Sequence, residues 1–134
     1  MARKVVVQKP PTLKPERALR ALAQQLEALR RLRGRRYDEA DAEETEWTRY
    51  TQSIIEGAFG DPSSERTSFF SACHAGSHRI GGLYPEERQQ NFEARQTEFE
   101  ALLLALISAL RLQLPEEEIK GVYEPGEELP STGT

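Results

Sequence analysis

The sequence predicts an all-α protein, a bundle of three long helices plus one short helix, with an extended N-terminal arm and a disordered acidic tail. Apolar residues recur at helical spacing in three long segments. Pro and Gly stand at the ends of those segments, where helices begin and end. With 134 residues, 37% of them hydrophobic, the chain is long enough for one domain with a core. We therefore expect an arm over 1–13, a helical bundle over 14–114 and a flexible tail over 115–134.

The first helix is predicted from Pro15 to about Arg33, after an arm in which Pro10 and Pro11 favour extended backbone. Pro suits the first helical turn, and Gly34 suits the C-terminal cap. Leucines at a 3-4-3 spacing form one apolar stripe: Leu19, Leu22, Leu26 and Leu29. The opposite face is mostly basic: Arg17, Arg20, Gln24, Glu27 and Arg31.

The second helix is predicted from about Glu39 to Ala58. Its opening is strongly acidic, which the positive end of the helix dipole favours. Its apolar stripe is expected to consist of Trp47, Tyr50, Ile54 and Ala58.

A short helix is predicted next, because Ser63 or Ser64 can cap a helix that reaches Phe69 or Phe70. Residues 71–83 contain three glycines and are expected to form a loop.

The third long helix is predicted from Pro85 to the residue before Pro115. Its apolar stripe has a coiled-coil-like spacing: Phe92, Phe99, Leu103, Leu106 and Leu110. Residues 101–110 are apolar on nearly all sides, and such a helix is usually buried on more than one side. A homo-oligomer or a partner protein would provide the second contact. The expected interface residues are Leu102, Leu104, Leu106 and Leu112.

Charge is divided unevenly along the chain. Residues 1–36 hold 11 Lys and Arg against two acidic residues, whereas residues 37–134 hold 7 basic and 20 acidic residues. The balance is therefore +9 against −13. The overall composition excludes a membrane span, a disulfide scaffold, collagen and a uniformly basic nucleic-acid-binding protein.

The sequence favours a cytoplasmic protein without membrane contact. The lone cysteine cannot form an internal disulfide, and the apolar run at 5–7 is too short for a signal peptide. The longest apolar run, 101–107, is far shorter than the roughly 20 residues of a membrane span. Residues 129–133 resemble the sortase sorting signal Leu-Pro-x-Thr-Gly. We interpret this as a chance match or as an artefact of cloning or truncation, because the apolar tail, basic end and signal peptide of that pattern are missing.

Cys73, His74 and His78 are the candidate residues for chemistry. A Cys with a nearby His can act as a nucleophile, and the three together can supply zinc ligands. An ordinary loop is the favoured interpretation, because there is no second Cys and the neighbouring glycines make the segment pliable. The acidic pairs on the third long helix do not suit a di-metal bundle, because neither His lies on it. We therefore expect no catalytic residue, no metal and no cofactor.

A basic cluster follows the first helix: Arg30, Arg31, Arg33, Arg35 and Arg36, with Tyr37 adjoining. Arginine pairs bidentately with phosphate and tyrosine stacks on bases, so the cluster indicates nucleic-acid or nucleotide binding. The alternative is an internal role. Six acidic residues within 38–46 follow directly and can pair with the cluster to hold one helix against the next, or the cluster can meet a neighbouring subunit's acidic tail.

Several motifs follow one another in order between a Leu-rich helix and a long last helix. They are Tyr37-Asp38, Trp47, Ile54-Ile55-x-x-Ala58-Phe59-Gly60, Asp61-Pro62-Ser63-Ser64, Phe69-Phe70-Ser71 and a Gly-rich His loop. This order, over about residues 15–112, resembles the helical N-terminal region that precedes TIR-like predicted nucleotide-binding domains in prokaryotic defence proteins. The resemblance implies an interaction or sensing domain and carries over no catalytic residue. Here no effector domain follows, which implies a stand-alone partner or a fragment.

The expected function is a non-enzymatic helical interaction or oligomerisation module, an adaptor or sensor subunit of a prokaryotic defence system. Burial of the apolar surface at 102–112 would drive assembly, and the charged segments would set register and partner choice. The alternative is a nucleic-acid- or nucleotide-binding protein that uses the Arg30–Arg36 cluster.

Overall fold

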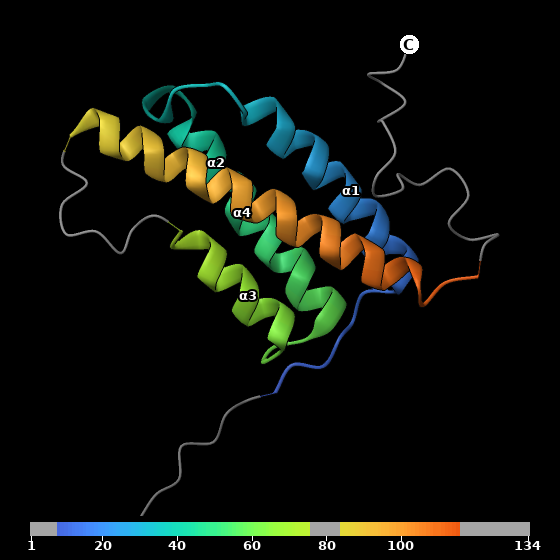
Figure 1. Cartoon of the computed structure of the whole chain (residues 1–134). Helices are drawn as coiled ribbons and strands as arrows, with labels where there is room; N and C mark the ends of the chain where they lie inside the picture. Colours follow the sequence, from blue (N-terminus) through green and yellow to red (C-terminus); the bar gives the residue numbers. More distant parts are fainter. Residues whose placement is uncertain (1–7, 76–83, 116–134) are drawn as a thin grey trace, which may run out of the picture.

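The computed structural model describes residues 8–75 and 84–115, and this part of the chain folds into four α-helices (Figure 1). The helices are α1 (Pro15–Leu32), α2 (Tyr37–Phe59), α3 (Ser64–Cys73) and α4 (Pro85–Arg111). The described residues form no strand, apart from one isolated bridge between Lys9 and Asp61. The all-α prediction is therefore confirmed. The predictions for arm residues 1–7, for 76–83 with His78, and for 116–134 lie outside the described residues.

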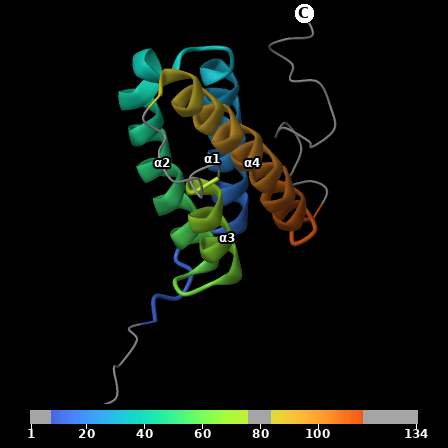
Figure 2. The same ribbon diagram turned by 60° about the vertical axis from the view of Figure 1, so that its left-hand side comes forward.

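The four helices pack as a bundle in which each helix contacts two main neighbours. Helix α1 packs on α2 and α4, and α3 packs on the same two helices from the other side. Helices α1 and α4 lie side by side and run in opposite directions, as Figures 1 and 2 both show. The end of α4 therefore lies beside the beginning of α1.

Helix α1 forms where the leucine spacing predicts it. It begins at Pro15, whose missing N–H costs nothing in the first turn, and it ends two residues before Gly34. Gly34 has a φ of 84°, a left-handed conformation that glycine adopts without steric cost. All four leucines of the predicted stripe are buried in the core. Because these leucines face the core, the basic face on the opposite side of α1 points outward.

Helix α2 begins two residues earlier than predicted, at Tyr37, and its stripe is partly wrong. Trp47 and Ile54 are buried, but Tyr50 is 59% exposed and Thr51 occupies the inward position instead. Burial of Thr51 is tolerated because its hydroxyl oxygen accepts a hydrogen bond from Gln25 Nε2 at 2.8 Å, which offsets the loss of water. The inward face of α2 would have been identified if the predicted apolar stripe had been allowed to include one polar residue.

Three aromatic rings occupy the centre of the bundle, one each from α2, α3 and α4. Trp47 and Phe99 have ring centroids 4.8 Å apart, and Phe69 stacks on Phe99 at 5.3 Å. Phe69 and Phe99 are each at most 1% exposed. Such rings bury 150–250 Å² each, so this trio is a principal source of the packing energy, about 3–5 kcal/mol for loss of one ring.

The segment before α1 is held against the end of α2. Thr12 and Leu13 both donate their backbone N–H to the carbonyl oxygen of Gly57, at 2.9 and 2.8 Å. Gly60, which ends α2, has a φ of 90°, and a Cβ there would lie 2.9 Å from the carbonyl oxygen of Lys9. Only glycine fits this close approach. The described part of the arm, 8–13, is thus a structural segment.

Helix α3 is longer than predicted. Ser63 caps it as expected, since its hydroxyl oxygen accepts from the backbone N–H of Arg66 at 3.0 Å. The helix continues to Cys73, so the predicted loop over 71–83 is wrong for its first three residues. Ala72 explains the extension, because it is buried one turn after Phe69 and adds to the same inward face.

Candidate interaction surfaces

The Arg30–Arg36 cluster lies where α1 ends and α2 begins, and four of its five arginines are paired with acidic residues. Arg30 and Arg33 both bind the carboxylate of Glu100 on α4, Arg30 at 3.3 Å. Arg35 pairs with Glu43 at 2.8 Å, and Arg36 with Asp38 at 3.4 Å. The pairs of Arg35 and Arg36 are with acidic residues within 38–46, as in the internal alternative, whereas Glu100 on α4 was not among the partners expected there. Arg31 is the exception and is exposed.

Two glutamines of α4 satisfy backbone groups at this same junction. Gln89 accepts from the N–H of Tyr37 at 2.8 Å and donates to the carbonyl oxygen of Arg35 at 3.0 Å. Gln96, 3% exposed, donates to the carbonyl oxygen of Leu32 at 3.2 Å. The end of α1 and the start of α2 thereby obtain partners for backbone groups that a helix leaves unsatisfied. Tyr37 is half-buried and contacts the core beside Phe92, so it is a packing residue at this junction.

Sequence reasoning missed both glutamines, although a signal for them existed. The predicted stripe on α4 skipped from Phe92 to Phe99. Filling that gap in the 3-4 spacing gives Gln96, and extending the spacing by three residues before Phe92 gives Gln89 on the same inward line. A polar residue at an inward position of a helix predicts a buried hydrogen bond.

A buried ion pair between α2 and α4 was also missed. The guanidinium of Arg95 binds the carboxylate of Glu44 with two bonds, Nε to Oε2 at 2.9 Å and Nη2 to Oε1 at 2.8 Å. The side chains are 24% and 10% exposed. Glu44 is one of six acidic residues within 38–46, and only its helical register with Ala40 and Trp47 distinguishes it from its exposed neighbours.

The predicted interface leucines fall into three environments. Leu106 is 5% exposed and lies in the core with Leu103 and Leu110, so its prediction as an interface residue is corrected. Leu102 and Leu104 are half-buried against the same core. Leu112 is 89% exposed. The reason is register, because Leu106 continues the inward stripe whereas Leu112 lies half a helical turn away from it.

An apolar face of α4 is turned away from the core. We call it the outer apolar face, and its members are Ala101, Leu102, Ala105, Ala109 and Leu112. All are exposed except the half-buried Leu102. Next to this face, between α3 and α4, lies an open groove of about 940 Å³. Its lining is formed mostly by small side chains: Thr67, Ser68, Ser71, Ala72, Ala75, Ala94, Thr97, Glu98, Ala101 and Leu102.

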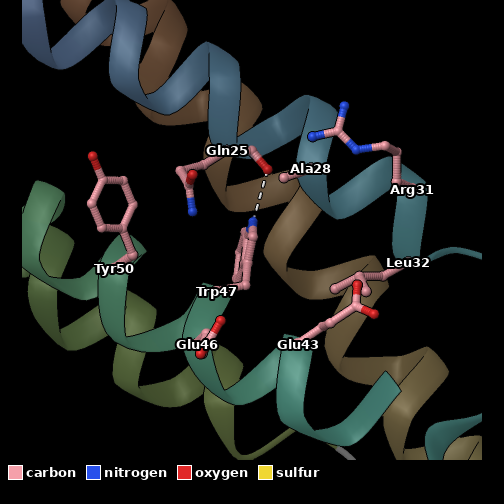
Figure 3. Close-up of a pocket in the computed structure, with 8 residues that line it drawn as sticks. All are labelled: Gln25, Ala28, Arg31, Leu32, Glu43, Glu46, Trp47 and Tyr50. Atoms are coloured by element: carbon pink, nitrogen blue, oxygen red, sulfur yellow. Dashed lines mark hydrogen bonds between the residues drawn. The ribbon is translucent and has the colours of Figure 1, made fainter. Parts of the chain in front are cut away.

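A second open groove, of about 520 Å³, lies between α1 and α2 (Figure 3). The indole N–H of Trp47 at its floor donates to the backbone carbonyl oxygen of Gln25 at 2.8 Å. Figure 3 shows Arg31 on the α1 wall and Glu43 and Glu46 on the α2 wall. None of the described residues that line this groove is a cysteine, histidine or serine, so they form no nucleophile–base pair.

Cys73 is half-buried at the end of α3, and His74 follows it as the C-cap residue. Burial raises the pKa of the Cys73 thiol, which disfavours the nucleophilic thiolate. His74 is exposed, and its ring packs at a tilt against Phe70 with the ring centroids 4.5 Å apart. Its Nδ1 lies 2.9 Å from the carbonyl oxygen of Phe70. Over residues 8–75 and 84–115, no group of three or more His, Cys, Asp or Glu side chains is placed to hold a metal ion. His78, the third candidate, lies outside these ranges.

Two further findings concern membranes and similar proteins. Within the described part of the chain, no helix has the length and apolar character needed to cross a membrane. No protein-family model matches the chain, and no curated protein or solved structure is significantly similar to it.

Proposed function

We propose that the chain is a non-enzymatic helical interaction module, which binds a second copy of itself or a partner protein through the outer apolar face of α4. The observation that carries this proposal is the exposure of four of the five residues of that face. Covering apolar surface is worth about 25 cal/mol per Å². A partner helix that covers the face and enters the adjoining groove would therefore gain substantial free energy.

Small side chains suit this kind of contact. Ala101, Ala105 and Ala109 recur every four residues, so a second helix can approach the α4 backbone closely along one line. Glu98 lies in the groove beside them and supplies a charge that can select one partner or one orientation over another. Leu112 extends the face by one further turn.

The resemblance to the helical region of TIR-like defence proteins supports a more specific role. In such an arrangement a helical region senses or docks while a separate domain acts. We propose accordingly that this chain is an adaptor or sensor subunit in a prokaryotic defence system. The support is the order of motifs over residues 15–112, which are mainly core-type residues.

The alternative function, nucleic-acid or nucleotide binding through the Arg30–Arg36 cluster, has weaker physical support. Four of those arginines already bind carboxylates, and a phosphate would have to displace them. Its test is a binding assay at two salt concentrations, because phosphate contacts predict a steep loss of affinity between about 50 and 200 mM salt.

Native mass spectrometry of the purified chain, with and without Ala105→Glu, tests the proposed interface. Ala105 is exposed, so the variant should keep the helical circular-dichroism spectrum while losing the oligomer or the partner. Leu104→Glu is a poorer probe, since half-buried Leu104 also contacts the core. The matched control is Gln90→Glu, which adds the same charge to an exposed position at the other end of α4. Equal loss of assembly in both variants, or unchanged assembly in Ala105→Glu, would contradict the proposal.

A further inference from the structure

The outer face of α1 carries arginines that have no partner among the described residues. Arg17, Arg20 and Arg31 are exposed, and none forms an ion pair or side-chain hydrogen bond within 8–75 and 84–115. At about 100° per residue, the three lie within about 60° of one another around the helix. We call them the basic row. It spans about 21 Å at 1.5 Å per residue, and exposed Lys14 precedes it by one turn.

The basic row differs from the Arg30–Arg36 cluster in its electrostatic state. In the cluster, carboxylates from α2 and α4 already neutralise four arginines. In the row, Arg17 and Arg20 are three residues apart and repel one another, and no described carboxylate forms an ion pair with either of them or with Arg31. A segment of opposite charge laid along α1 would remove that repulsion.

The chain itself carries an acidic segment that starts close to this row. Residues 116–134 contain six Glu and one Lys, a balance of −5. They follow the end of α4, which lies beside the beginning of α1 (Figures 1 and 2). Leu13, just before α1, and Leu114, just after α4, pack against the same core cluster. The acidic segment therefore starts at the Arg17 end of the row.

The length of the segment is sufficient to follow the row to its far end. Nineteen extended residues reach up to about 63 Å at 3.3 Å each, against a row of about 21 Å. Three glutamates, 116–118, come at the start of the segment, and the proposed docking would bring them to Lys14, Arg17 and Arg20. Three more, Glu124, Glu127 and Glu128, come late enough to meet Arg31.

We propose that the acidic segment 116–134 docks on the basic row of α1 in the same molecule. Each exposed ion pair is weak and is screened by salt, so the contact forms and breaks readily. The covalent tether compensates with an effective concentration in the millimolar range. The docked segment acts as a built-in competitor, so an external polyanion binds the row only by displacing it. This contact is independent of the outer apolar face of α4.

Paramagnetic relaxation measured by NMR on the full chain tests this proposal. A nitroxide is attached at Thr132→Cys in a chain that also carries Cys73→Ala, so that there is one labelling site. At low salt we expect broadening of the α1 amides near Arg17, Arg20 and Arg31, and not of those in α3. The broadening should fall at least twofold in the variant Arg17→Gln, Arg20→Gln, Arg31→Gln. It should disappear at about 1 M salt, where the screening length is about 3 Å.

The matched control is Arg49→Gln, which removes one exposed charge from α2 and should leave the broadening intact. A second variant, with the six glutamates of the segment changed to Gln, removes the charge without touching the folded bundle. Undiminished α1 broadening in the triple arginine variant, or none at low salt, overturns the proposal. So does broadening that appears only between labelled and unlabelled molecules. Oligothymidylate that binds while the segment stays docked would overturn the role of the segment as a competitor for the row.

Discussion

Two groups of arginines on neighbouring surfaces of α1 and its C-terminal junction have opposite surroundings. Arg30, Arg33, Arg35 and Arg36 are close together in sequence, yet each meets a carboxylate of the same molecule. The arginines of the basic row are spread over 15 positions and meet none among the described residues.

The difference shows that density of charge in a sequence is a poor guide to a binding surface. A dense cluster between two helices is surrounded by other chain segments, and carboxylates on those segments can reach it. The row lies on the outward face of α1, and even Arg31, which lines the groove between α1 and α2, forms no ion pair with Glu43 or Glu46 across it. Helical register, rather than local count, therefore decides which cations remain open to a ligand. Three predictions compare arginines that are paired with carboxylates and arginines that are not, in order of decreasing effect on the free energy of unfolding.

The largest effect is expected for Arg95→Ala, which removes one partner of the buried ion pair. The carboxylate of Glu44, 10% exposed, would lose both hydrogen bonds and remain as an uncompensated charge. Breaking such a pair costs about 3 kcal/mol, at the low end of the usual range because Arg95 is itself partly exposed. Urea unfolding measures the loss in free energy of unfolding.

The control for that substitution is Arg49→Ala, an exposed arginine of α2 for which a change within about 0.5 kcal/mol is expected. The double variant Glu44→Leu, Arg95→Leu should recover part of the loss, because it leaves no buried charge behind. Equal losses in Arg95→Ala and Arg49→Ala would show that the ion pair contributes nothing to the fold.

The sequence predicted the course of the helices well because apolar periodicity and helix-ending residues are local signals. The leucine stripe of α1, the aromatic and leucine stripe of α4, and the Ser63 cap are all as predicted. Polar residues at inward positions were the main failure. Thr51, Glu44 and Gln96 are buried because each finds a partner on another helix. Helical spacing alone marks these positions as inward, but a partner distant in sequence has no local signal, so the hydrogen bond that makes the burial favourable could not be predicted.

A candidate surface could be predicted from the sequence only where all of its residues lie on a single helix. The excess of apolar residues at 101–110 pointed to α4 as the helix with a second apolar face. Which of these residues point inward depends on how α4 packs against the other helices, and this packing buries Leu106 in the core. The pairing of the Arg30–Arg36 cluster was an open alternative. It could not be decided from sequence, because Glu100 is 67 residues or more away from its two arginines.

An intermediate effect is expected for Glu100→Gln, which uncouples α4 from Arg30 and Arg33. The carboxylate is 17% exposed but Arg33 is 57% exposed, so water already screens part of the interaction. The expected loss is about 1 kcal/mol, and it should shrink at high salt. Urea unfolding at low and high salt measures both quantities. Glu98→Gln, an exposed position on the same helix, is the matched control, and a loss as large there would contradict the assignment.

The smallest effect is expected for Arg17→Ala, Arg20→Ala and Arg31→Ala, each within about 0.5 kcal/mol of the parent chain by the same unfolding measurement. These side chains contact no described carboxylate, alanine is the best helix former, and removing one charge relieves repulsion along the row. A loss above about 1 kcal/mol for any of them would mean that the row supports the fold. If the three substitutions leave the free energy of unfolding unchanged, a loss of docking in the triple variant cannot be attributed to unfolding of α1.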